Sequence, residues 1–193
     1  MSLLLKLLTY LTAAVIIGLI SAWYMITVGS ALTVQTAGPW SIWFAAGNPE
    51  ADPYTRAHFA RSGRLPITST SARYYVARRD STGDTLDADC EYQITGSKIP
   101  GSWWSLAAYD SSGDIMPNKA KRYAFNKQNL SVNDDGSYQI KLSPFARPGN
   151  WLPMSGGSRV QLILRIYRGD AIDNLLSREN ASEILPTIKR VSC

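Results

Sequence analysis

The residue types from which catalytic and metal sites are usually built are scarce in this sequence. It holds one histidine, His58, and two cysteines, Cys90 and Cys193, in 193 residues. These are too few for a zinc site with the usual Cys and His ligands. Any Ser-His-Asp or Cys-His mechanism would have to use His58, and no Gly-x-Ser-x-Gly turn is present. We therefore expect no catalytic residue, metal or cofactor, and the sequence favours a non-catalytic protein over an enzyme.

Concentrated positive charge is also missing. The net charge is +5, and the basic residues are scattered with acidic ones close by. A nucleic-acid interface needs a basic face or a recognition motif. Neither is present, so we expect no nucleic-acid partner.

Charge is absent altogether from Leu7 to Val28, over 22 residues. As a helix this segment would be about 33 Å long, enough to cross a hydrocarbon core of about 30 Å. Lys6 precedes it, and Trp23 and Tyr24 lie near its far end, where an aromatic belt is expected. A cleaved signal peptide ending at residues 29–31 is the alternative, but signal h-regions run only about 7 to 15 residues. The pattern favours a single-pass anchor over residues 1–28 in the cytoplasmic (inner) membrane, with a periplasmic C-terminal domain.

Cysteine usage suits the outer side of that membrane. A disulfide between Cys90 and Cys193 would close a loop of about a hundred residues and contribute about 4 kcal/mol in the chain-entropy account. The alternative is two unrelated thiols, one in a strand and one at the terminus. We expect the disulfide.

Residues 29–47 carry no charge and are predicted to connect the anchor to the domain. The aromatic residues there either begin the core of the domain or rest at the membrane interface; they are Trp40, Trp43 and Phe44. Next, Asp52 can cap a helix that Pro53 begins, which predicts a short helix over residues 53–61. Four of its residues share one side: Tyr54, Ala57, His58 and Arg61.

Beyond Pro66 the sequence alternates strand patterns with turns. At least six strands separated by turn signals are typical of a sandwich or barrel. We therefore predict a mainly β domain over residues 48–193. The expected strands are 72–79, 88–96, 103–110, 121–126, 137–143 and 158–168.

The strand WWSLAAYD raises a question, because successive side chains of a strand point to opposite faces. Trp104, Leu106 and Ala108 should face the core. Trp103, Ser105, Ala107 and Tyr109 then share the outer face, which carries no charge. Either the helix over 53–61 or a ligand or partner should cover this face, and we expect the chain itself to bury Trp103.

Several blocks resemble the bacterial family called domain of unknown function 1214. They include GPWSIWFAAG, DPYTRAHFARSGRLP, CEYQITGSKIPGSWWSLAAYD, DGSYQI, NWLP and LRIY, in that order between about Gly38 and Val191. The resemblance implies an antiparallel, jelly-roll-like β-sandwich. In the family this domain is often paired with a domain of unknown function 1254, whose place the anchor takes here. No reaction is implied.

NWLP, residues 150–153, predicts either a rigid corner that plugs the core or one wall of a pocket. In the second case Trp103 or Tyr109 would lie across from Trp151, and polar contacts would come from Arg165 or Tyr167. These five are the candidate ligand-binding residues.

Two functions remain open. The first is a non-catalytic, membrane-anchored module that binds an envelope protein or glycan. The second is a hydrolase of envelope glycan or lipid that uses a carboxylate pair about 5 to 9.5 Å apart. The candidate carboxylates of this hydrolase lie near predicted strands; they are Asp89, Glu91, Asp110 and Asp114. Asp110 and Asp114 flank the sequence SSG, however, which is typical of residues that stabilise a turn.

Overall fold

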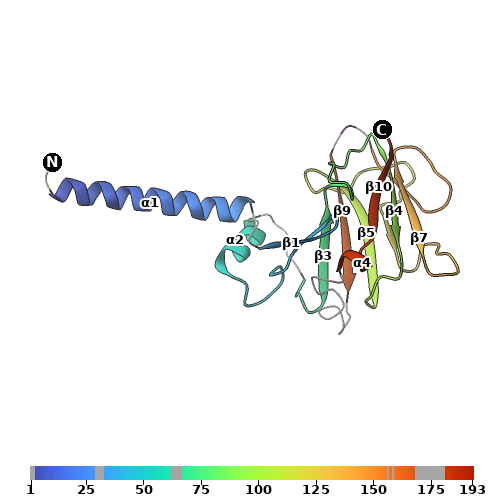
Figure 1. Cartoon of the computed structure of the whole chain (residues 1–193), viewed down its shortest axis with the longest axis horizontal. Coiled ribbons are helices and arrows are strands. Elements are labelled where there is room, and N and C mark those ends of the chain that lie inside the picture. The colour runs from blue at the N-terminus through green and yellow to red at the C-terminus, as the bar shows by residue number, and fades with distance from the viewer. Residues whose placement is uncertain (1–2, 29–32, 62–66, 156, 158, 168–180) are drawn as a thin grey trace. The chain divides into compact units, whose positions relative to one another are not determined.

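The computed structural model describes residues 3–28, 33–61, 67–155, 157, 159–167 and 181–193. The chain forms two compact units. The anchor unit comprises residues 1–34 and 44–69, and the sandwich unit comprises residues 35–43 and 70–193. A long helix dominates the first unit and strands dominate the second (Figure 1). The fold is therefore mainly β, as the sequence predicted.

The anchor unit holds helices α1 (Leu3–Val28) and α2 (Pro53–Arg61). In α1, residues Leu3–Thr27 are long and apolar enough to cross a membrane, and the mean hydropathy reaches 2.3 over 18 of them. The Asp52 carboxylate caps α2 by accepting hydrogen bonds from the amides of Tyr54 and Thr55, at 2.9 and 3.0 Å. The expected helix over 53–61 is thus present. Residues 29–31, the alternative signal cleavage site, lie outside the described residues.

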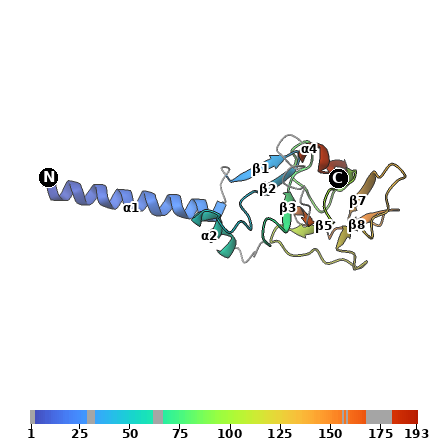
Figure 2. The same cartoon turned by 90° about the horizontal axis from the view of Figure 1, so that it is seen from below.

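The sandwich unit contains two sheets. The six-stranded sheet has the order β1 (Val34–Ala37), β2 (Trp40–Trp43), β3 (Ala72–Ala77), β9 (Val160–Tyr167), β5 (Trp103–Asp110) and β6 (Ala124–Asn126). The four-stranded sheet has the order β10 (Thr187–Ser192), β4 (Glu91–Gly96), β7 (Tyr138–Ser143) and β8 (Trp151–Pro153). Figure 2 shows β7 and β8 in a different layer from β3. A short helix, α4 (Ala181–Ile184), precedes β10.

Each described strand pairing is antiparallel except one. Strand β8 runs parallel to β7, with Leu152 opposite Leu142. The NWLP block supplies β8, so the predicted corner is also a short edge strand. The four-stranded sheet is therefore mixed, and the jelly-roll connectivity implied by the family resemblance stays a prediction.

Alternation along β5 and β9 builds the core. Trp104, Leu106 and Ala108 lie opposite Ile166, Leu164 and Leu162 in register. All six are at most 4% exposed. The Trp104 ring stacks on Tyr138 of the other sheet, with 5.9 Å between ring centroids. The prediction that Trp104, Leu106 and Ala108 face the space between the sheets is confirmed.

Two turns of the same sequence type close neighbouring hairpins. In DSTGD the Asp80 carboxylate accepts hydrogen bonds from the amides of Thr82 and Asp84, both at 3.0 Å. In DSSGD the Asp110 carboxylate accepts them from Ser112 and Asp114, at 2.8 and 3.0 Å. Aspartate is favoured where a side chain can bond the backbone two residues on, so these aspartates hold the turns.

The expected connector over residues 29–47 contains β1 and β2. Trp40 on β2 is 1% exposed, belongs to the main core cluster, and donates a hydrogen bond to the carbonyl of Pro186 at 2.6 Å. Of the two roles open for the aromatic residues of this stretch, Trp40 takes the core role. Ala37 and Ile42 of the same stretch are partly buried against this core.

A disulfide joins Cys90, immediately before β4, to Cys193, immediately after β10. Their Cα atoms are 4.1 Å apart across 103 residues of sequence. Because β10 pairs with β4 from Thr187 to Ser192, the disulfide closes the free end of this edge pair. It therefore fixes the C-terminal strand to the sheet.

Candidate functional site

The outer face of β5 and β9, on the side away from the core, gathers most of the polar and aromatic residues singled out from the sequence. In register, Trp103 lies opposite Tyr167, Ser105 opposite Arg165, and Tyr109 opposite Gln161. Four of the five predicted binding residues are thus on one face; they are Trp103, Tyr109, Arg165 and Tyr167. We call these four, together with Gln161 of β9 and Tyr74 of β3, the outer-face site.

Arg165 is the central cation of the outer-face site. Its guanidinium donates a hydrogen bond to the Tyr109 hydroxyl at 2.7 Å and lies 5.3 Å from the centroid of that ring. The Tyr74 ring of β3 lies 5.8 Å away. Among the described residues, no carboxylate forms an ion pair with Arg165. A half-buried guanidinium held by aromatic rings in this way retains donors for an anion.

Gln161 adds an unpaired acceptor beside Tyr109. Its side chain is 3% exposed, and its Nε2 donates to the carbonyl of Asp110 at 3.0 Å. Its Oε1 is buried and has no hydrogen-bond partner within the described chain. A buried polar atom usually has a partner. The amide oxygen is therefore a buried acceptor without a donor among the described residues.

Trp103 and Tyr167 form the aromatic end of the outer-face site. Their rings meet edge to face, with centroids 5.2 Å apart. The Trp103 indole nitrogen donates to the Gln128 side chain at 2.9 Å. Both aromatic residues are half-buried, so each leaves part of a ring open to a ligand.

The outward-facing residues of β5 that follow Trp103 are buried. Ser105 is 7% exposed, Ala107 is 3% exposed, and Tyr109 is 8% exposed. The uncharged outer face expected from WWSLAAYD is thus covered over most of its length, whereas Trp103 is only half-buried. The expected cover of Trp103 by α2 stays a prediction, since α2 belongs to the other unit. The described partners of Trp103 are Gln128 and Tyr167.

Trp151 lies on the other sheet. It stands opposite Lys141 on β7, and its indole nitrogen donates to the carbonyl of Ser143 at 3.0 Å. Leu152, the next residue, is fully buried in the core, so Trp151 points to the outer face of the four-stranded sheet. The structure therefore does not place it across a pocket from Trp103 or Tyr109.

Three of the four carboxylates considered for hydrolysis, those of Asp89, Glu91 and Asp110, have structural partners. Asp110 holds its turn, and Asp89 accepts a hydrogen bond from the amide of Gly157 at 3.1 Å. Glu91 accepts hydrogen bonds from Arg147 and Ser143, and the Arg147 guanidinium lowers the pKa of Glu91. These contacts support the turn and ion-pair roles for this set. No group of three or more His, Cys, Asp or Glu side chains among the described residues could hold a metal ion.

His58 lies in the anchor unit. Its Nδ1 is 2.7 Å from the carbonyl oxygen of Ile26, near the end of α1. Because a carbonyl only accepts, Nδ1 carries the proton of this hydrogen bond. His58 is thus a packed residue that bonds a helix end.

Sequence reasoning missed Gln161 and Tyr74 as parts of the site. Gln161 is the one uncharged polar residue in the apolar run VQLILRIY of β9. That position was a usable signal, because an isolated amide in a buried strand needs a partner. Tyr74 gave no such signal, since its place beside Arg165 depends on how β3 pairs with β9.

A family described as Protein of unknown function (DUF1214) matches residues 71–171, which is just over half of the 193 residues. The chain belongs to this family. The match includes all of β3 to β9 and hence every residue of the outer-face site. No curated protein matches this DUF1214 chain.

Two solved structures are similar to this DUF1214 chain. The VPA0106 protein from Vibrio parahaemolyticus is 24% identical, with a TM-score of 0.59 over 74% of this chain and 36% of that one. A putative uncharacterized protein from Burkholderia cenocepacia is 21% identical, with a TM-score of 0.44 over 63% of this chain and 29% of that one. The chain thus spans about a third of the length of these proteins. The first similarity supports the fold.

Proposed function

We propose that this protein is a single-pass, membrane-anchored binding module that holds its sandwich unit outside the cytoplasmic membrane. Its ligand is an acidic glycan of the cell envelope, bound at the outer-face site. The observation that carries this proposal is Arg165. Its half-buried guanidinium is held by Tyr109 and Tyr74 and has no carboxylate partner among the described residues.

The anchor and its orientation are supported by α1 and by the disulfide. The apolar segment Leu3–Thr27 has 25 residues, which makes a helix of about 37 Å against a hydrocarbon core of about 30 Å. Lys6 precedes the long apolar run, and positive charge is retained on the cytoplasmic side. The disulfide between Cys90 and Cys193 suits an oxidising compartment outside the cytoplasm.

The chemistry of the outer-face site favours a carboxylated sugar. Arg matches the planar carboxylate with paired donors and also stacks on aromatic rings. The half-open rings of Trp103 and Tyr167 offer apolar faces for the pyranose ring. Aromatic walls with a few placed polar groups are typical of small-ligand sites.

Membrane topology is tested first. The full chain should sediment with membranes and resist carbonate extraction, because α1 remains in the bilayer. Protease added from outside should cleave only after about Gly47. Recovery of a soluble mature chain that begins near Leu32 would show a cleaved signal instead.

Ligand class is tested on the full chain in lipid nanodiscs. We expect binding to a uronic-acid polysaccharide and loss of binding to the same polysaccharide after its carboxyl groups are reduced. The Arg165→Gln variant should lose at least tenfold in affinity for the acidic form, whereas the Arg122→Gln variant, which removes a cation elsewhere on the sandwich unit, should not. Equal affinity for the acidic and reduced polymers would contradict the role of Arg165.

A further inference from the structure

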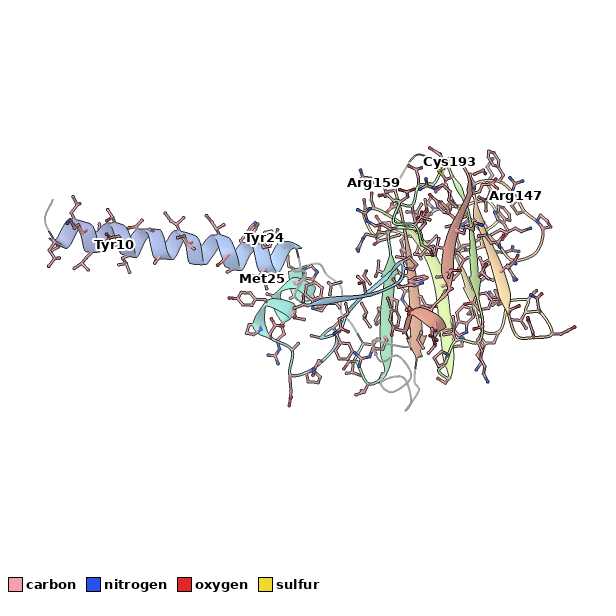
Figure 3. All side chains as sticks on the ribbon, viewed as in Figure 1. Tyr10, Tyr24, Met25, Arg147, Arg159 and Cys193 are labelled. Carbon is pink, nitrogen blue, oxygen red and sulfur yellow. A yellow bond between two sulfur atoms is a disulfide. The ribbon has the colours of Figure 1, made fainter. Side chains whose placement is uncertain are left out.

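Helix α1 is packed only at its C-terminal end. Every residue from 3 to 21 is exposed, whereas Ala22 and Met25–Thr27 are half-buried. Figure 3 shows Tyr24 and Met25 at this end of α1, beside α2. Residues 3–21 of α1 are therefore open to lipid, whereas the C-terminal end of α1 contacts α2.

Two contacts fix α2 to the C-terminal end of α1. The His58 Nδ1 donates to the carbonyl of Ile26 at 2.7 Å, and the Arg61 guanidinium lies 4.2 Å from the centroid of the Trp23 ring. His58 and Arg61 are three residues apart and so share one helix face. A cation over Trp and a donor to a free end carbonyl are both stabilising. The position of α2 along α1 is thus defined by its own side chains.

This position sets the depth of α2 in a membrane. The apolar segment of α1 has 25 residues, so it exceeds the hydrocarbon core by about 7 Å, or roughly one helical turn. Because Lys6 marks the other end of the uncharged run, the turn that holds Trp23 and Ile26 lies at the outer end of the span, where the hydrocarbon core meets the lipid headgroups. Because α2 contacts these two residues, it lies at the same level.

The side chains of α2 and of the C-terminal end of α1 are of the types that lie among lipid headgroups. Trp23, Tyr24 and Tyr54 are 60%, 57% and 44% exposed, and Trp and Tyr are the residues enriched at both membrane interfaces. Helix α2 itself carries two arginines, Arg56 and Arg61, and no acidic residue. Arginine binds lipid phosphate with paired donors while its apolar stem lies along the acyl boundary.

We propose that α2 and the C-terminal end of α1 bind the phosphate layer of the membrane that α1 crosses. We call this surface the headgroup collar; it consists of Trp23, Tyr24, Tyr54, His58 and Arg61. This inference rests on the proposed function in one respect, namely that α1 is an anchor in the bilayer. The collar holds α2 at the membrane surface. The described residues 44–61 and 67–69 are then part of the membrane attachment.

The test uses the full chain in phospholipid vesicles with one nitroxide label per variant. Since the described chain has no free cysteine, the introduced thiol is the labelling site. Ala60→Cys reports on α2, Ile16→Cys on the middle of α1, and Asp135→Cys on a turn of the sandwich unit. Collision with dissolved oxygen and with a water-soluble nickel complex gives the depth of each label.

We expect the Ala60 label to read headgroup depth, between the Ile16 label in hydrocarbon and the Asp135 label in water. An Ala60 label as water-accessible as the Asp135 label, with Ile16 in hydrocarbon, overturns the collar and leaves the anchor intact. An Ile16 label in water overturns both the anchor and the collar.

A matched pair of variants tests the contact that sets the depth. Arg61→Gln removes the cation over Trp23, and it should shift the Ala60 label toward water. Arg56→Gln removes an equal charge from α2, but that guanidinium bonds the carbonyl of Pro49 in the same unit, so the label should stay at headgroup depth. Equal shifts in the two variants would show a general charge effect and contradict the defined contact.

Discussion

Arg165 and Tyr109 meet across the outer face of β5 and β9, where the guanidinium donates a 2.7 Å hydrogen bond to the tyrosine hydroxyl. Their register partners are Ser105 and Gln161, so the two residues are offset by four positions along the strands. Ala107 lies between them and is 3% exposed. A small residue at that position gives the two long side chains room to meet.

Tyr109→Phe tests this hydrogen bond. The ring remains and the hydroxyl is lost, so we expect the free energy of unfolding to fall by about 0.5–1.5 kcal/mol. Urea unfolding of the full chain in detergent, followed by tryptophan fluorescence, measures the change. Tyr123→Phe is the matched control, because Tyr123 is 41% exposed. A loss in the control as large as that in Tyr109→Phe would contradict a specific role for the Tyr109 hydroxyl.

The double variant Cys90→Ala, Cys193→Ala tests the disulfide. The bond closes a loop of 103 residues, and removing it should lower the free energy of unfolding by about 2–4 kcal/mol. Non-reducing mass analysis should show the wild-type chain two hydrogens lighter than its reduced form. Unfolding midpoints that do not change on reduction would contradict a stabilising bond.

Asp80 makes stability depend on acid pH. Burial by itself raises the pKa of Asp80, but hydrogen bonds from Thr82 and Asp84 and the charge of Arg190 outweigh it, so the pKa is lowered below 3.8. The contribution of Asp80 is therefore present above the unfolded-state pKa and is lost as the pH falls through the folded-state pKa.

Asp80→Asn should remove about 2 kcal/mol at neutral pH and flatten the loss of stability in acid. Asp84→Asn is the control, because its side chain is 66% exposed and pairs with the same Arg190. Exposed pairs contribute about 0–1 kcal/mol, so this control should change little. Unfolding at a series of pH values measures both. An acid slope in Asp80→Asn equal to that of the wild type would contradict the assignment.

Trp104 and Trp103 should respond differently to truncation. Trp104 is 4% exposed and stacks on Tyr138 in the core, so Trp104→Ala should lower the free energy of unfolding by about 3–5 kcal/mol. Trp103 is half-buried on the outer face, and Trp103→Ala should cost clearly less stability while weakening glycan binding. Equal destabilisation with unchanged binding would assign Trp103 a purely structural role.

Local rules predicted much of this fold from the sequence. Alternation in WWSLAAYD placed Trp104 in the core because a strand has a period of two. The Asp-Ser-x-Gly-Asp turns were readable because the aspartate bonds its own turn. The helix at Pro53–Arg61 followed from its cap, and the face it offers to α1 carries two of the residues expected on one side, His58 and Arg61.

The pairing of segments that are distant in the sequence could not be predicted from local patterns. Trp40 enters the core because β2 pairs with β3 and its indole reaches Pro186, which lies 146 residues away. Trp151 is separated from Trp103 because β8 joins β7 in parallel. Such choices depend on contacts between distant segments, and no local pattern encodes them. The outer-face site shows both cases, since Arg165 was readable in its strand while Tyr74 depended on the neighbouring strand.

The most direct test of the central claim is hydroxyl-radical footprinting of the full chain in nanodiscs, with and without the acidic polysaccharide. Trp103 and Trp151 are a matched pair, because both are half-buried indoles on outer faces of different sheets. Binding at the outer-face site predicts that the polysaccharide protects Trp103 and Tyr167 from oxidation and leaves Trp151 unchanged. Protection of Trp151 with no protection of Trp103 would contradict it.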